Sequence, residues 1–128
     1  MSWKYSFVSR EEFHQKKALV GEIILKFGGS VVDEKVCKNA WTEAGGGKFS
    51  SSPIYEFHGR YYKINEILFE DIPCIVLEWS DTLREAVLNV MEDINPFPYN
   101  WPVRKIEREL MFELELEPYP DDWPDFNY

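Results

Sequence analysis

The sequence predicts a single α+β domain, with an antiparallel sheet of about four to five strands packed on one face against two to three helices. Segments with helical spacing of apolar residues lie among segments that alternate as strands do. The length of 128 residues suits one hydrophobic core, and the aromatic fraction of 16% is too high for a disordered chain. We assign residues 1–120 to the domain and residues 121–128 to an acidic, aromatic C-terminal tail.

The N-terminal part predicts a strand followed by a helix. Residues 3–8 alternate loosely between apolar and polar side chains, as a first strand would. Ser9 then begins a helix, because a serine followed three residues later by Glu12 forms a capping box. Apolar residues at helical spacing continue this helix to about Phe27, and Gly28 begins the glycine pair that ends it.

The middle of the chain predicts a sheet. Residues 30–52 indicate only a short strand or helical turn and then a glycine- and serine-rich loop. Residues 54–57 and 60–64 flank His58-Gly59, which fits the tight turn of a β-hairpin. Residues 72–79 form a near-continuous apolar run, which is typical of a strand buried on both faces.

Two helices are expected after the sheet. Thr82 begins the first with a second capping box. Residues 95–102 are rich in proline and break it, and Pro102 can begin the next helix. We expect that helix to reach about Glu115, although residues 112–117 also alternate as a strand would. The stripe that predicts the first of these helices consists of Leu83, Ala86, Val87, Val90 and Ile94.

The net charge of −9 is unevenly distributed along the chain. Residues 1–69 carry ten basic and eight acidic side chains, whereas residues 70–128 carry four basic and fifteen acidic ones, a balance of −11. Such a field repels nucleic acid and anionic membranes and attracts a basic protein surface. No apolar run approaches a membrane span and the N-terminus does not resemble a signal peptide, so we expect a cytoplasmic location.

Common catalytic and metal-binding patterns are not found in the sequence. His14 and His58 have no second ligand at a spacing typical of a transition-metal site, and we expect neither metal nor cofactor. Residues 45–48 lack the spacing and the following Ser or Thr of a phosphate-binding loop. Cys37 and Cys74 belong to no CxxC pair and are expected to be free thiols.

The densest acidic region is interleaved with aromatic side chains near the C-terminus. Aromatic residues supply buried area at an interface, and surrounding carboxylates steer and pair with Lys or Arg. In an alternative interpretation the aromatic residues cap the core and the acidic residues only keep the surface soluble. The candidate partner-binding residues are Tyr99, Trp101, Glu113, Glu115, Glu117, Asp121, Asp122, Trp123 and Asp125.

A general resemblance points to one class of protein. The size, the acidity of residues 70–128, and the aromatic segments Glu78-Trp79-Ser80-Asp81 and Pro96-Phe97-Pro98-Tyr99 resemble the immunity proteins of bacterial toxin systems. The resemblance implies a protein that binds a cognate toxin domain, often a basic nuclease, and blocks its active site. The class has no motif that maps onto this sequence, so it assigns no functional residue.

Three functions follow as hypotheses. The first is a non-enzymatic inhibitor that binds and neutralises a basic toxin-like partner. The second is a small-molecule-binding or enzymatic domain with a pocket between sheet and helices, where Tyr61, Tyr62, Glu78 and His58 would be the polar groups. The third is a subunit of a larger assembly, which a large exposed apolar patch would indicate.

Overall fold

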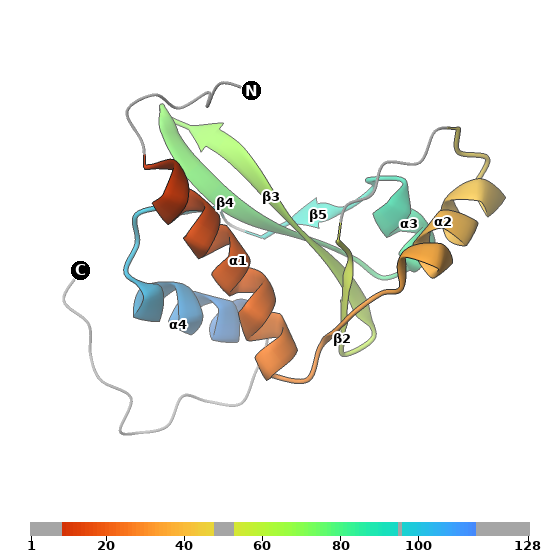
Figure 1. Ribbon diagram of the computed structural model, residues 1–128, viewed down its shortest axis with the longest axis horizontal. Helices are drawn as coiled ribbons and strands as arrows, with labels where there is room; N and C mark the ends of the chain where they lie inside the picture. The colour runs from red at the N-terminus through yellow and green to blue at the C-terminus, as the bar shows by residue number, and fades with distance from the viewer. Residues whose placement is uncertain (1–8, 48–52, 95, 115–128) are drawn as a thin grey trace.

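The computed structural model describes residues 9–47, 53–94 and 96–114, and the strand expected at residues 3–8 lies outside them (Figure 1). Within these ranges four helices and a six-stranded antiparallel sheet confirm the α+β class. The strand order is β1-β2-β3-β4-β5, and β6 pairs with β4 as well. The helices are α1 (Arg10–Lys26), α2 (Glu34–Glu43), α3 (Leu83–Val87) and α4 (Val103–Glu113). The strands are β1 (Ser30–Val31), β2 (Tyr55–Phe57), β3 (Arg60–Phe69), β4 (Ile72–Ser80), β5 (Glu92–Asp93) and β6 (Phe97–Pro98).

Helix α1 begins and ends as its sequence predicts. The Ser9 side chain accepts a hydrogen bond from the backbone N–H of Glu12 at 3.2 Å. At the other end Gly28 has a φ of 102°, which glycine adopts without steric cost. The backbone N–H of Gly29 then donates to the carbonyl of Ile24 at 2.9 Å, which satisfies one of the last open carbonyls of the helix.

Two tight turns set the register of the strands β2, β3 and β4. His58 and Gly59 have φ values of 48° and 79°, and they connect β2 to β3 as the sequence predicts. Glu70 and Asp71 have φ values of 49° and 66° and connect β3 to β4. The second turn was not predicted, because it has neither the asparagine nor the glycine that this backbone conformation favours.

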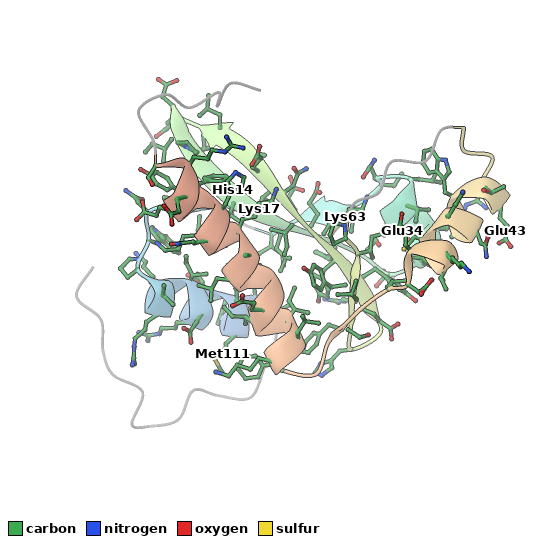
Figure 2. All side chains as sticks on the ribbon, viewed as in Figure 1. His14, Lys17, Glu34, Glu43, Lys63 and Met111 are labelled. Atoms are coloured by element: carbon green, nitrogen blue, oxygen red, sulfur yellow. The ribbon has the colours of Figure 1, made fainter. Side chains whose placement is uncertain are left out.

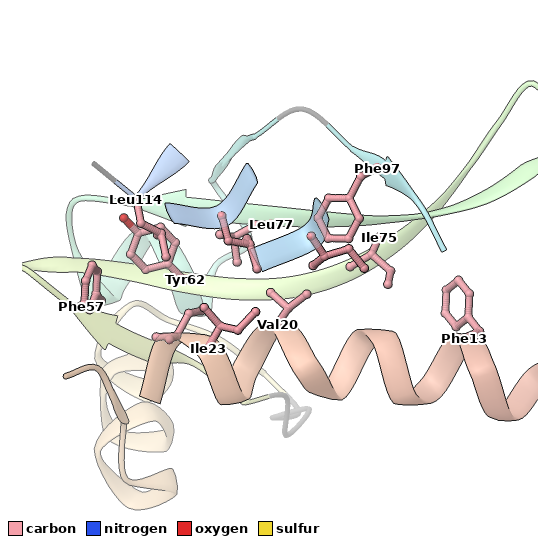
Figure 3. Packing of buried hydrophobic residues seen from close by; sticks show 12 residues of the cluster. Phe13, Val20, Ile23, Phe57, Tyr62, Ile75, Leu77, Phe97 and Leu114 are labelled. Atoms are coloured by element: carbon pink, nitrogen blue, oxygen red, sulfur yellow. The ribbon is translucent and has the colours of Figure 1, made fainter. Parts of the chain in front are cut away.

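The larger hydrophobic core lies between one face of the sheet and the helices α1 and α4. Alternate residues of β3 and β4, such as Tyr62, Ile75 and Leu77, point to this face. Figure 3 shows Val20 and Ile23 of α1 pointing toward them. Its buried members are Phe13, Val20, Ile23, Ile24, Phe57, Tyr62, Ile75, Leu77, Phe97, Ile106, Leu110 and Leu114.

A second, smaller core lies on the other face of the sheet, so the expectation that helices pack on only one face was wrong. Its buried members are Cys37 of α2, Ile54 beside β2, and Ala86 and Val87 of α3. Tyr61 packs against this cluster, whereas Tyr62, the next residue of β3, belongs to the larger core. In Figure 1 the pair α2 and α3 therefore lies at the far end of the sheet from α4.

The helix expected between Thr82 and Ile94 is much shorter than predicted. The Thr82 cap is present, but α3 ends at Val87. Asn89 then has a φ of 59°, and the N–H of Val90 donates to the carbonyl of Glu85 at 2.9 Å, which closes the helix. The chain then turns back and pairs with β4 as strand β5. The apolar residues whose spacing predicted one long helix therefore belong partly to α3 and partly to the segment that follows it.

Helix α2 was missed, and it explains the glycine-rich segment that follows it. Asp33 caps the helix by accepting from the N–H of Lys35 at 2.8 Å. The Trp41 indole N–H donates to the carbonyl of Gly47 at 3.0 Å, and a Cβ at Gly46 would collide with the Trp41 ring. The absence of a side chain at Gly46 therefore allows the backbone to pack directly against the Trp41 ring.

Helix α4 agrees with the predicted third helix. Pro102 is its N-cap rather than its first residue, and the helix includes Phe112 and Glu113, which contradicts the strand alternative there. Ile106, Leu110 and Leu114 are buried, whereas Val103 is 42% exposed. The expected end at Glu115 lies outside the described residues.

Replacing Asn89 tests the turn that ends α3. Its side-chain oxygen accepts from the Lys63 ammonium at 2.7 Å, and Lys63 is only 9% exposed. Asn89→Ala removes this acceptor and places alanine at a positive φ, so we expect a loss of about 2–3 kcal/mol in urea unfolding. Asn89→Gly loses only the acceptor and should be less destabilising. Equal losses for the two variants would show that the backbone conformation contributes nothing.

Candidate functional site

A small cleft opens between α4 and the edge formed by β5 and β6. Its volume is about 60 Å³, which suits one small side-chain group rather than a metabolite. Most of its lining is apolar, and two carboxylates lie on α4 at its border. The lining residues are Leu77, Ile94, Pro96, Phe97, Trp101, Glu109, Leu110 and Glu113.

The two carboxylates of the cleft are Glu109 and Glu113, one helical turn apart. Burial raises the pKa of Glu113, and the charge of Glu109 raises it further. Like charges at this spacing destabilise a helix by about 0.2–0.5 kcal/mol. Among the residues that the structure describes, neither has an ion-pair or hydrogen-bond partner. The cleft therefore combines an apolar floor with two carboxylates at its border, and the Lys105 ammonium lies nearby, 4.1 Å from the centre of the Trp101 ring.

The segment that carries Tyr99 and Trp101 is fixed from α1. The Lys16 ammonium donates to the carbonyl of Trp101 at 2.6 Å and to that of Tyr99 at 3.3 Å. The Trp101 ring stacks on Phe97 with 5.8 Å between centroids, and Tyr99 packs against Phe13 at 6.2 Å. Trp101 thus lines the cleft, whereas Tyr99 covers the larger core.

The structure brings two of the nine predicted partner-binding residues together. Trp101 and Glu113 line the same cleft, and Tyr99 does not. The other six, Glu115, Glu117, Asp121, Asp122, Trp123 and Asp125, lie outside the described residues.

The sequence prediction missed Glu109 and the strand-edge side of the cleft. Ile94 and Phe97 come from the segment that had been assigned to a helix and its terminating loop. One signal was available, since Glu109 and Glu113 are four residues apart on a predicted helix and must share a face.

The four residues of the alternative pocket do not come together. His58 lies in the β2–β3 turn and stacks on Phe57 with 3.9 Å between ring centroids. Tyr62 is buried in the larger core, whereas Tyr61 packs against the smaller one. Glu78 pairs with Lys63 across β3 and β4 and so shares the face of Tyr61.

A polar cluster surrounds Glu78 on that face. Glu78 lies opposite Lys63 on one side and opposite Asp93 on the other. Burial raises the pKa of Glu78, and the neighbouring carboxyl group of Asp93 raises it further, through a hydrogen bond and through its negative charge. Asn65 donates to Glu78 at 3.4 Å. Burial also lowers the pKa of Lys63, whose ammonium donates to Asn89.

Metal and thiol chemistry have little support within residues 9–47, 53–94 and 96–114. No group of three or more His, Cys, Asp or Glu side chains there could hold a metal ion. Cys37 and Cys74 are free and buried, as predicted, and burial raises the pKa of both thiols, which disfavours the nucleophilic thiolate. Among the same residues no helix is both long and apolar enough to cross a membrane.

The Glu78–Asp93 contact predicts a change of stability with pH. The folded state holds the Glu78 pKa above its ordinary value of 4.5, so its contribution to stability is present below pH 4.5 and is lost as the pH rises through the raised pKa. Glu78→Gln keeps a neutral donor toward Asp93 at every pH. We expect this variant to melt at a higher temperature than the wild type at neutral pH, with the difference vanishing in acid.

Glu56→Gln on β2 is the matched control, because Glu56 is exposed. An equal, pH-independent change in both variants would contradict a raised pKa of Glu78.

The chain was compared with protein-family models, curated proteins and solved structures. No family model matches it, and no curated protein or solved structure gives a significant match. Function must therefore follow from the chemistry of its own residues.

Proposed function

We propose that the protein is a non-enzymatic binding protein that recognises and neutralises a basic, toxin-like partner, and that the α4 cleft is its anchor site. The observation that carries this proposal is the pair Glu109 and Glu113, which border an apolar cleft without a cationic partner among the described residues. A charge arrangement that lowers stability is favourable once a cation from a partner occupies it.

The cleft can receive part of a lysine or arginine side chain. Both have an apolar stem that packs on hydrophobic surface and a charged head that stays polar. The stem would contact Ile94 and Leu110, and the head would lie between Glu109 and Glu113. A hydrogen bond to a charged group contributes about 1.5–3 kcal/mol, which is enough for one side chain to dominate a small interface.

The charge of the whole chain supports approach by a basic protein. Residues 70–128 carry a balance of −11, which accelerates the association of a basic surface at low salt. Helix α4 itself carries three basic residues and three acidic ones, so the excess of negative charge lies outside this helix. A toxin that uses basic side chains to hold nucleic acid would present the same side chains to this cleft.

Affinity capture from the source cell at low salt, followed by stepwise salt elution, tests the proposal. The immobilised wild-type chain should retain one basic protein stoichiometrically. Glu109→Gln with Glu113→Gln should release it at lower salt and slow its association, because the anchoring charges are gone. Glu34→Gln with Glu43→Gln on α2 removes the same charge far from the cleft and is the matched control (Figure 2).

Retention of the partner by the cleft variant and the control to the same salt concentration would remove the cleft from the proposal. A wild-type chain that retains no specific protein at any salt would contradict the binding function itself. The captured protein should also lose its own activity when the wild-type chain is added, as inhibition requires.

A further inference from the structure

Strand β5 is held to β4 by very few interactions. It has two residues and pairs only with the end of β4, where Asp93 lies opposite Glu78. The backbone N–H of Ile94 then donates to the carbonyl of Leu77 at 2.7 Å. Because β5 is the last strand in the order, its other side pairs with no described strand. One unfavourable contact in this short pairing therefore weighs heavily on whether β5 stays in place.

Glu78 and Asp93 lie where the side chains of the two strands come closest. Leu77 and Ile94 are joined by a backbone hydrogen bond, so the next pair along the strands is a non-hydrogen-bonded one. Side chains at such a pair are closer together than at a hydrogen-bonded pair. Two charged carboxylates in this position repel each other and weaken the pairing of their strands. A protonated Glu78 removes this repulsion and donates a hydrogen bond to Asp93.

Lys63 is the cation that faces Glu78, and its ammonium is engaged elsewhere. It lies opposite Glu78 on β3, but it donates to the Asn89 side chain at 2.7 Å. Among the described residues it forms no ion pair with Glu78. The charge of Lys63 lowers the pKa of Glu78, but burial and Asp93 together raise it by more. The carboxyl pair is therefore not neutralised by its own sheet.

The helices around this pair contribute further titratable groups, which act on other residues. The Cys37 thiol of α2 lies near Lys63, and Glu85 of α3 accepts from the Thr82 hydroxyl at 2.8 Å. Asp93 and Lys63 are thus the charged groups that set the protonation of Glu78. The groups from the helices are Asp33, Glu34 and Cys37 of α2 and Arg84 and Glu85 of α3, with Glu109 and Glu113 of α4 across the sheet at the cleft.

The carboxyl pair is connected to the α4 cleft through the backbone. Asp93 immediately precedes Ile94, and Ile94 and Leu77 both line the cleft. Phe97 also lines it but is held separately, because β6 pairs with β4 and the Phe97 ring stacks on Trp101. Release of β5 would therefore move Ile94 away from Leu77 while Phe97 keeps its place.

We propose that the Glu78–Asp93 pair is a pH-sensitive latch on the cleft, which holds β5 against β4 when Glu78 is protonated and releases β5 and Ile94 when both carboxylates are charged. The folded arrangement raises the Glu78 pKa above 4.5, so the latch is complete below pH 4.5 and weakens as the pH rises through the raised pKa. The cleft then has a closed form in acid and a wider form at higher pH. The latch belongs to the chain alone and does not rest on the proposed partner.

Amide hydrogen exchange, followed by NMR from acid to neutral pH, tests the latch on the purified full chain. The protection factor of the Ile94 amide should fall by roughly two- to fivefold as the pH rises, the change that a like-charge pair across two strands produces. The Tyr99 amide, which donates to Pro73 at 3.1 Å, is the internal control and should keep its protection. The methyl resonances of Leu77 and Ile94 should shift with the same midpoint.

Three variants separate the latch from other titrating groups. Glu78→Gln should hold the protection of Ile94 at its acid value at every pH, because its neutral amide still donates across the strands. Glu92→Gln removes the same charge from β5 but on the other face of the strand, and should titrate as the wild type does. Glu113→Gln removes the cleft carboxylate whose pKa is also raised, and should likewise leave the pH dependence of Ile94 in place.

Two outcomes for Ile94 itself would overturn the proposal. One is a protection factor that does not change with pH in the wild type, and the other is a change that survives in Glu78→Gln. Loss of the Tyr99 protection together with that of Ile94 would also overturn it, since the whole sheet and not β5 alone would then be opening.

Discussion

The antiparallel pairing of β3 with β4 is the constraint on which the other elements depend. Side chains alternate along both strands, so this one register decides which residues face α1 and α4 and which face α2 and α3. A slip of one residue would bring Lys63 into the larger core and expel Tyr62 from it. The Glu70-Asp71 turn fixes this register although its positive φ values are unfavourable for both residues.

Local signals predicted the parts of the fold that local interactions determine. Ser9 and Gly28 define the ends of α1, and His58-Gly59 defines a hairpin, because caps and tight turns depend on adjacent residues. The helix after Thr82 was predicted too long because periodicity does not reveal a residue such as Asn89 that leaves the helical backbone conformation. Helix α2 escaped prediction because its apolar contacts are few and lie on the second face of the sheet.

The sequence predicted an acidic and aromatic candidate site, but it did not predict which residues line the cleft. Trp101 and Glu113, both selected from the acidic and aromatic enrichment near the C-terminus, line the same cleft, and their role in partner binding stays a prediction. The cleft itself is made by α4 and by Ile94 and Phe97, which approach α4 only because β5 and β6 add to β4. That contact is a property of the assembled sheet, and no spacing along the chain encodes it.

The two cores of unequal size have a consequence for how the molecule opens. The smaller one is made of short side chains from α2 and α3, and it buries less apolar area than the core under α1. Because fewer apolar side chains are buried here, we expect this end of the sheet to open before the rest of the molecule. Each such excursion would present the Cys37 thiol to solvent. The rate at which Cys37 is alkylated would therefore report this local opening.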